Sequence, residues 1–526
     1  MATPEAARLE LFTHRFAAVA REMGEQLRRT ALSTNVKERL DFSCALLDAE
    51  GELVVNAPHI PVHLGALGLC VRAVSAALPL APGDTVITNH PAYGGSHLPD
   101  VTLVTPVFGG AGLLGYVASR AHHAELGGTR PGSMPPDART LAEEGVVLAP
   151  AYLMRRGEPR WDELEQRLRA GPWPSRAVPE NLADLEAAAA ANHRGREALL
   201  ELGRRHGEAE VRAYMAALKE EAAARMAEAL GELAGDYEAR QELDDGSPLQ
   251  VRIEISGRRA RIDFSGSAGV HPGNLNATPA VVRSVVLYVL RLLVRRPLPL
   301  NEGLLRPVEV VVPRGILNPE FDPDPARAPA VVGGNVETSQ RLVDTLLAAL
   351  RLAACSQGTM NNVLFGTAEW GYYETICGGC GAGPGFAGAS AVHSHMTNTR
   401  ITDPEVLEHR YPVRLERFAI RRGSGGAGRW RGGDGAVREF VFLAPMSLSL
   451  LGQHRRQGPY GMDGGAPGLA ARQRLIRAAG EEQALGAAWG GEVKTGDRLV
   501  VETPGGGGWG RPAPPPGDGG DGDGPP

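Results

Sequence analysis

The spacing of apolar residues predicts long helices at the start and in the middle of the chain. Residues 4–30 and 182–237 repeat apolar positions every three or four residues, with charged residues between them, as in a helix with one buried face. Gly203 and Gly207 predict a break that divides the second segment into two helices. A shorter run, Val281–Val294, predicts a buried helix, because arginines interrupt it and it falls short of the ~20 apolar residues that a membrane span needs.

Short apolar runs bounded by turn residues predict antiparallel strands in the first part of the chain. The pattern of Lys37–Val55 is typical of a hairpin that turns at Asp48–Gly51. Val101–Phe108 and Leu113–Ser119 predict a second hairpin, whose turn is the glycine-rich segment Gly109–Gly112. These elements predict an N-terminal region in which helices pack against a sheet.

The second half of the chain is richer in strands and in glycine. Pro248–Ser267 predicts strands, Gly333–Ala353 a helix capped by Thr338, and residues 358–510 short strands joined by glycine turns. The expected fold class is α+β and multidomain, with mixed sheets, a long helical segment in the middle and a glycine-rich, β-dominated C-terminal half. The expected divisions are an N-terminal α/β region, a helical segment, an α+β to β-rich region and a disordered tail, at residues 1–180, 181–240, 241–510 and 511–526.

Composition and charge exclude several classes of protein. The formal net charge is −6 and the isoelectric point is near 6.2, so nothing favours binding to nucleic acid or to an anionic membrane. The five cysteines are an odd and sparse set, which argues against a disulfide framework and for a reducing cytoplasm. The N-terminal residues lack the pattern of a signal peptide, so we expect a soluble, cytoplasmic chain. The sequence contains no phosphate-loop motif, and its two GxGxxG matches, at Gly383 and Gly423, do not join a strand to a helix.

One end of the second hairpin brings together residue types that bind divalent metals. His97 and Asp100 lie three positions apart, directly before its first strand. Folding the hairpin at its glycine turn makes the numbers of paired residues sum to about 221, which places Asp100 beside Ala121 and His122. Two imidazoles and a carboxylate in this arrangement predict a site for zinc, manganese or iron rather than calcium. The alternative is that these histidines only pack the hairpin.

Further residues extend this candidate site. Asp41 begins an apolar strand, where a carboxylate acts as a cap, a salt-bridge partner, an additional metal ligand or a base. His63 precedes an apolar helical run and either lines the space in front of the metal or hydrogen-bonds the backbone at a turn. His123 and Glu125 follow His122 closely and strengthen the metal hypothesis. The residue pattern leaves these roles open.

Several long segments of the sequence are similar to one known family. They run in order from about residue 35 to residue 510 and include ERLDFSCALLD, GGSHLPDVTLVTPVF, SRAHHAELGG, GGNVETSQR and RYPVRLERFAIRRGSGGAGRWRGGDG. The chain thereby resembles the hydantoinase B/oxoprolinase family, the HyuB-type subunit shared by N-methylhydantoinases, 5-oxoprolinases and, more distantly, acetone and acetophenone carboxylases.

The resemblance implies metal ligands at the hairpin end. His97, Asp100 and His122 match positions that look like ligands in the relatives, and Asp41 matches a family aspartate that completes the set. The metal implied is zinc, manganese or iron.

The resemblance also implies an activity that needs a partner. The HyuA-type subunit of the family carries the ATP site, which agrees with the missing phosphate loop here. The expected function is the metal-bearing subunit of an ATP-dependent cyclic amide hydrolase, acting on a C–N bond of a phosphorylated lactam or hydantoin within a hetero-oligomer. His123 or His63 would then act as general base. Two alternatives stay open: a subunit of an ATP-dependent ketone carboxylase, and a non-catalytic scaffold subunit.

Overall fold

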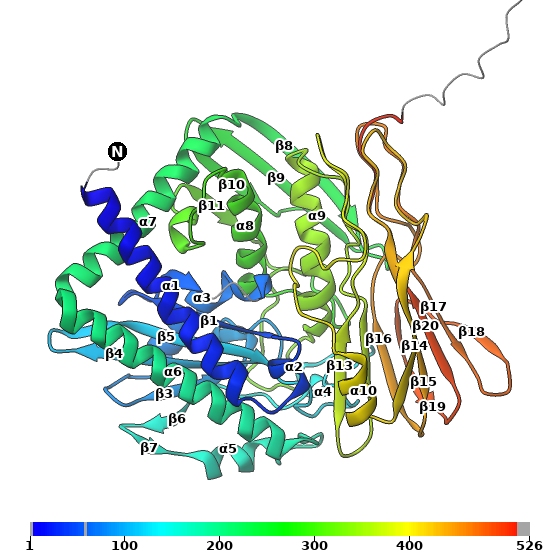
Figure 1. Ribbon diagram of the computed structural model, residues 1–526, viewed down its shortest axis with the longest axis horizontal. Helices are drawn as coiled ribbons and strands as arrows, with labels where there is room; N and C mark the ends of the chain where they lie inside the picture. The colour runs from blue at the N-terminus through cyan, green and yellow to red at the C-terminus, as the bar shows by residue number, and fades with distance from the viewer. Residues whose placement is uncertain (1–3, 57–59, 513–526) are drawn as a thin grey trace, which may run out of the picture.

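The computed structural model describes residues 4–56 and 60–512 (Figure 1). The tail predicted to be disordered, residues 511–526, lies outside the described residues from residue 513 onward. Helices over one large sheet fill one side of the molecule, and strand-rich sheets from the C-terminal half fill the other (Figure 1). This arrangement confirms the predicted α+β class with mixed sheets and a β-dominated C-terminal half.

Seven strands form the N-terminal sheet, and neighbouring strands are antiparallel. In spatial order they are β2 (Leu53–Asn56), β1 (Phe42–Leu47), β5 (Gly112–His122), β4 (Asp100–Gly109), β3 (Thr85–Thr88), β6 (Ala151–Arg155) and β7 (Glu158–Pro159). The pairs β1–β2 and β4–β5 confirm both predicted hairpins. The central strands are buried on both faces, which explains why the sequence shows apolar runs there rather than strict alternation.

Helices cover both faces of this sheet. On one face, α1 (Pro4–Thr30) and α6 (Val178–His206) share a core with β1, β4 and β5 (Figure 1). On the other face, α3 (Ala66–Ala77) packs against the alternate residues of the same strands. Each large apolar side chain buried in this way stabilises the fold by about 1.5–3 kcal/mol relative to its exposed state.

The predicted helical middle segment is confirmed as two helices that meet at Gly207. α6 ends at His206 and α7 (Glu208–Gly231) begins directly after Gly207, whose φ of +83° lies in the left-handed region that favours glycine. The predicted end at residue 237 is wrong, because α7 stops at Gly231 and Gly235–Glu242 forms strand β8. This segment contains helix-favouring residues, but it pairs with β9 along its whole length, and that pairing decides its conformation.

A second sheet and two buried helices form the middle of the molecule. The sheet has the order β11 (Val308–Val311), β10 (Arg259–Asp263), β9 (Pro248–Ser256) and β8. Helices α8 (Pro279–Leu293) and α9 (Ser339–Ala349) share its core, and α8 confirms the predicted buried helix. Among the described residues, no helix is long and apolar enough to cross a membrane.

The start of α9 differs from the predicted Thr338 cap. Gly334–Thr338 forms one π-helical turn that continues directly into Ser339, so Thr338 lies inside the helix and its hydroxyl donates to the carbonyl of Leu275. A Cβ on Gly334 would lie only 1.9 Å from the carbonyl oxygen of Asn276, so this turn can pack there only because it carries glycine. Single π-helical turns are frequent at functional sites.

Two further sheets form the C-terminal half and share one core. One has the order β13 (Gly371–Thr375), β12 (Asn362–Gly366), β16 (Met446–Leu451) and β19 (Ala488–Val493), and the other has the order β14 (Val413–Arg421), β15 (Gly435–Phe442), β20 (Arg498–Glu502), β17 (Arg472–Ile476) and β18 (Glu482–Ala484). The remaining short helices are α2 (Thr34–Lys37), α4 (Leu141–Glu144), α5 (Trp161–Leu168), α10 (Pro404–Arg410) and the 3₁₀ turns Pro61–His63, Pro91–Tyr93 and Glu302–Leu305. All five cysteines are free thiols, as the sequence predicts.

Candidate metal centre

Three neighbouring strands place polar residues in one row at the end of the N-terminal sheet. Asp100 at the start of β4 pairs with His122 at the end of β5. The backbone N–H of His122 donates to the carbonyl oxygen of Asp41, 3.0 Å away, just before β1. Directly opposed residues of antiparallel strands point to the same face. Asp41, His122 and Asp100 therefore lie side by side, on the face that α3 covers further along the strands.

The register of the β4–β5 hairpin confirms that Asp100 lies beside His122. The numbers of paired residues sum to 221 next to the turn, as predicted, and to 222 beyond a β-bulge between Val107 and Phe108. The bulge adds one residue to β5, so His122 rather than Ala121 is directly opposite Asp100. Without this extra residue, His122 would point to the other face of the sheet.

His97 completes the cluster from the turn before β4. The backbone N–H of Asp100 donates to the carbonyl of His97 at 3.2 Å, so the three-residue spacing folds the two side chains together. His97 Nδ1 lies 3.2 Å from Asp100 Oδ2, and His97 Nε2 lies 3.3 Å from His122 Nδ1. One ligand atom from each of these residues lies within 4.8 Å of the others. Asp41 Oδ2 lies 3.9 Å from His122 Nδ1.

The side chains of this cluster are closed off from water and contain polar atoms without partners. Their exposed fractions are 0% for His97, 1% for Asp100, 3% for His122 and 5% for Asp41. Among the described residues, His97 Nδ1, Asp100 Oδ1 and His122 Nε2 make no hydrogen bond. Buried polar atoms almost always make hydrogen bonds, and here two imidazoles and a carboxylate with such atoms lie together, so the cluster offers the types of ligand that a divalent cation binds.

The protonation states of the cluster also fit a metal. Burial, aided by His97, lowers the pKa of His122 well below its usual value, so its imidazole is neutral. Burial raises the pKa of Asp100, but His97 and His63 outweigh it and hold that pKa well below the usual value. Burial raises the pKa of Asp41 to about 7. A neutral imidazole and an ionised carboxylate are the forms that bind metal.

His63 contacts the cluster through Asp100. Its Nε2 lies 3.2 Å from Asp100 Oδ2, and its Nδ1 lies 3.0 Å from the hydroxyl oxygen of Ser43. Ser96 donates a hydrogen bond of 2.5 Å to the same oxygen of Asp100. Burial lowers the pKa of His63, so its ring is neutral and able to accept a proton.

His123 lies away from the cluster. Its Nδ1 is 3.0 Å from Asn181 Oδ1 on α6, and α6 covers the opposite face of the sheet. Burial lowers the pKa of His123, and the nearby carboxylate of Asp184 opposes this effect. The structure therefore brings His63, but not His123, to the candidate ligands.

Two residues that were not predicted from the sequence support His122. Tyr373 on β13 stacks on its imidazole, with ring centroids 4.5 Å apart and planes 12° from parallel. The guanidinium of Arg39 lies 4.8 Å from the centre of the Tyr373 ring, and its Nη1 donates to the Tyr373 carbonyl at 2.6 Å. No local pattern indicates Tyr373, because it is distant from His122 in the sequence, whereas Arg39 stands within the family-like segment ERLDFSCALLD.

A chain of hydrogen bonds connects Tyr373 with Glu337 in the π-helical turn before α9. The Tyr373 hydroxyl donates to Asn362 Oδ1 at 3.0 Å, and Asn362 Nδ2 donates to Glu337 Oε1 at 2.7 Å. Burial raises the pKa of Glu337 to about 8, so this carboxyl is protonated at neutral pH. The turn is thereby linked to the side chain that packs on His122.

Known proteins are similar to nearly the whole chain. The 5-oxoprolinase 1 of Arabidopsis thaliana is 44% identical over 531 residues, which cover 95% of this chain and 41% of that protein. An uncharacterized protein of Methanocaldococcus jannaschii is 34% identical over 508 residues, which cover 93% of this chain and 88% of that protein. The crystal structure of the ATP-dependent caprolactamase from Pseudomonas jessenii superposes with a TM-score of 0.86 at 27% identity, covering 97% of this chain and 92% of that one.

These comparisons agree with the family resemblance of the sequence. The chain spans about two fifths of the length of the eukaryotic relatives it matches, such as the Arabidopsis protein, but most of the archaeal one. The sequence profile of the hydantoinase B/oxoprolinase family matches residues 5–512. The chain belongs to the hydantoinase B/oxoprolinase family.

Proposed function

We propose that this chain is the metal-bearing subunit of an ATP-dependent cyclic amide hydrolase, which opens a 5-oxoproline-like or hydantoin-like ring after a partner subunit has phosphorylated it. The observation that carries the proposal is the buried cluster of His97, Asp100 and His122, with an unpaired polar atom on each residue. The relatives support the reaction class, because one is named a 5-oxoprolinase and another an ATP-dependent caprolactamase, and both names denote cyclic amides.

We assign the ATP to a partner chain of the HyuA type. This chain matches 41% of the length of the Arabidopsis 5-oxoprolinase. The rest of that longer protein is therefore long enough to contain a second domain. The 526-residue sequence contains no phosphate-loop motif. A separate subunit would then supply the ATP site that we assign to the remainder of the longer relative.

The cluster suits attack of water on an activated amide carbon. An amide resists water because resonance delocalises the nitrogen lone pair, and phosphorylation of its oxygen removes that protection. A bound divalent cation such as zinc, manganese or iron would lower the pKa of water toward neutrality and polarise the carbon. His97 and His122 offer imidazole nitrogens, Asp100 offers an ionised oxygen, and Asp41, with a pKa of about 7, ionises readily beside positive charge.

His63 is the proton carrier that the contacts favour. Its Nε2 faces Asp100 Oδ2 and its Nδ1 faces the Ser43 hydroxyl, so a proton taken up on the ring is shared at once with two acceptors. His123, the other candidate, contacts Asn181 on the α6 side instead. Because the cluster residues are at most 5% exposed, substrate entry requires movement of the residues that cover them.

The test is to co-express this chain with a HyuA-type partner and to measure bound metal by elemental analysis together with lactam-dependent ATP hydrolysis. We expect about one equivalent of metal in the wild type and loss of both metal and coupled hydrolysis in His97→Ala and Asp100→Ala, since ligand removal opens the site. His14→Ala is the matched control, because His14 is 72% exposed and lies on α1.

The same assay separates the alternatives. Full lactam hydrolysis by a metal-depleted complex would refute the metal-centre mechanism. ATP turnover that requires bicarbonate and acetone, and that ignores 5-oxoproline and hydantoin, would favour a ketone carboxylase. A wild-type chain without stoichiometric metal, in a complex that still turns over, would favour a scaffold subunit.

A further inference from the structure

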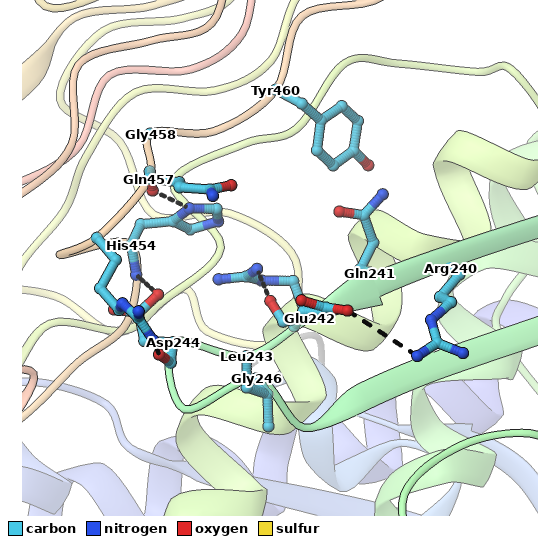
Figure 2. A pocket seen from close by; sticks show the side chains of 12 residues that line it. Arg240, Gln241, Glu242, Leu243, Asp244, Gly246, His454, Gln457, Gly458 and Tyr460 are labelled. Atoms are coloured by element: carbon cyan, nitrogen blue, oxygen red, sulfur yellow. Dashed lines mark hydrogen bonds and ion pairs between the residues drawn. The ribbon is translucent and has the colours of Figure 1, made fainter.

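A cavity of about 450 Å³ lies between strand β8 and the loop that follows β16 (Figure 2). Figure 2 shows Arg240, Gln241 and Glu242 on the strand side, and His454, Gln457 and Gly458 on the loop side. The lining also includes Arg341 from α9, together with Leu243, Asp244, Gly246, Arg456 and Tyr460. None of the candidate metal ligands is part of this lining, so the cavity is a separate feature of the described chain.

Arg341 is a buried cation whose charge has no partner. Its exposed fraction is 4%, and its Nη1 donates to the backbone carbonyl of Glu242 at 2.5 Å. Among the described residues, no carboxylate lies within ion-pair distance of Arg341, and its Nε and Nη2 make no hydrogen bond. Burying an unpaired charge is costly, so such a group indicates a counter-ion supplied from outside.

The two unpaired nitrogens of Arg341 define the shape of that counter-ion. Nε–H and Nη2–H lie on one edge of the planar guanidinium and point in nearly the same direction. This edge fits the two oxygens of a carboxylate in a bidentate pair.

The charges around the cavity favour a monoanion. Arg240, Arg341 and Arg456 contribute positive charge to the lining, and Glu242 and Asp244 contribute negative charge, which leaves an excess of one positive charge. Both oxygens of Asp244 already accept backbone N–H groups of the loop, at 3.1 and 2.8 Å. Glu242 lies 3.9 Å from Arg240. Arg456 is exposed to water, so the buried positive charge without a partner is that of Arg341.

The remaining polar groups of the lining are neutral. Gln241 and Tyr460 extend toward one another in Figure 2, and the Tyr460 hydroxyl donates to the carbonyl of Asp344 at 2.8 Å. His454 Nδ1 donates to the carbonyl of Gln457 at 2.8 Å, which leaves the other ring nitrogen as an acceptor. Burial, aided by Arg341, lowers the pKa of His454 well below its usual value, so its ring adds no charge. Amide and hydroxyl groups around one buried cation suit a small polar molecule of net charge −1 that carries a carboxylate.

We propose that this cavity binds a small organic carboxylate, of the size of an amino acid, and that the lining shifts on binding so that the buried Nε and Nη2 of Arg341 form a bidentate pair with it. The cavity volume lies within the usual range of small-molecule sites. Binding here does not depend on the proposed hydrolysis, because none of the contacts involves the metal centre.

The test is calorimetric titration of the full chain with glutamate and, separately, with inorganic phosphate. We expect saturable binding of glutamate and weaker binding of phosphate, because phosphate carries more charge than the lining can balance. Arg341→Met is expected to weaken glutamate binding at least about tenfold, because it removes both donors of the pair. Arg341→Lys keeps the charge but not the two-donor edge, so its affinity for glutamate is expected to lie between those of the wild type and Arg341→Met.

The matched control is Arg240→Met. It removes another cation of the lining, but one that already has the carboxylate of Glu242 beside it. Its affinity for glutamate is expected to stay within about threefold of the wild type. Circular dichroism and bound metal report whether each variant is folded. Absence of saturable glutamate binding by the wild type, tighter binding of phosphate than of glutamate, or equal affinities of folded Arg341→Met and wild type would each overturn the proposal.

Discussion

The candidate metal cluster and the Arg341 cavity both contain buried polar atoms without hydrogen bonds, but of opposite chemistry. In the cluster, the atoms without a hydrogen bond come from two imidazoles and a carboxylate, and each of these residues places one ligand atom within 4.8 Å of the others. In the cavity, the unpaired atoms are two N–H donors on a single guanidinium. Converging lone pairs fit a cation, and adjacent donors fit an anion. The charge of a missing ligand therefore follows from whether the unpaired atoms accept or donate.

The largest effect is expected from His122→Ala, which tests whether the two sites are independent. Loss of this ligand is expected to lower metal affinity by more than about 100-fold and to abolish coupled hydrolysis, since loss of a mere supporting residue already costs about 10–100-fold. Glutamate binding in the cavity is expected to stay within about twofold, because no cavity contact involves His122. Elemental analysis and calorimetry measure the two effects in one preparation. Loss of glutamate binding in this variant would show that the sites are coupled.

Glu337→Gln tests whether the buried carboxyl of Glu337, in the π-helical turn before α9, is neutral, in contrast to the charged Arg341 one turn later. The pKa of Glu337 is raised from 4.5 to about 8, so its stabilising effect is complete below pH 4.5 and is lost as the pH rises through 8. Across this window the unfolded state releases a proton that the native state keeps, which lowers the free energy of unfolding by up to about 1.4 kcal/mol per pH unit. The variant lacks this loss, so its stability relative to the wild type is expected to increase with pH.

Urea unfolding at several pH values between 4.5 and 8 measures this difference. Parallel stability curves for the variant and the wild type would contradict a raised pKa at Glu337. Glu369→Gln serves as the control, because Glu369 lies on an exposed turn.

Tyr373→Leu tests how far the metal cluster depends on the C-terminal sheets. Removing the ring that stacks on His122 is expected to lower metal affinity by about 10–100-fold, because residues that orient metal ligands have effects of this size. Tyr373→Phe keeps the stacked ring and loses only the bond to Asn362, so it is expected to cost about 1 kcal/mol of stability and little metal affinity. Competition with a metal chelator measures both affinities. Equal losses of metal affinity in Tyr373→Leu and Tyr373→Phe would exclude a role for the stacking.

The smallest effect on metal is expected from His123→Ala, which contrasts two adjacent histidines. His123 contacts Asn181 on the α6 side, so its loss is expected to lower stability by about 1–2 kcal/mol and to leave metal content unchanged. Thermal unfolding and elemental analysis measure the two outcomes. Metal loss in a folded His123→Ala protein would show that this histidine reaches the cluster.

The parts of the site that the sequence predicted lie close together along the chain. His97, Asp100 and His122 belong to one turn and one hairpin, so strand pairing alone brings them together. Asp41 follows because β1 pairs with the same strand β5. Tyr373 and Arg341 could not be predicted in this way, since only the packing of the C-terminal sheets and of α9 brings them to their sites.

The errors in the fold prediction have the same physical origin. The predicted helix ran to residue 237, but Gly235–Glu242 pairs with β9 along its whole length and forms a strand. Thr338 resembles a helix cap, but the close contact of Gly334 with the backbone of Asn276 lets the chain begin its helical path one turn earlier. In both cases a contact with another segment, rather than the local pattern, decided the conformation.

The β-bulge between Val107 and Phe108 has a consequence for how this hairpin tolerates change. It takes up one surplus residue of β5 near the solvent-facing tip, before the ladder reaches the candidate ligands. A residue inserted or deleted between the tip and the bulge can be compensated at the bulge, so the pairing nearer Asp100 and His122 stays unchanged. A length change between the bulge and His122 has no such buffer and would rotate the imidazole to the far side of the sheet.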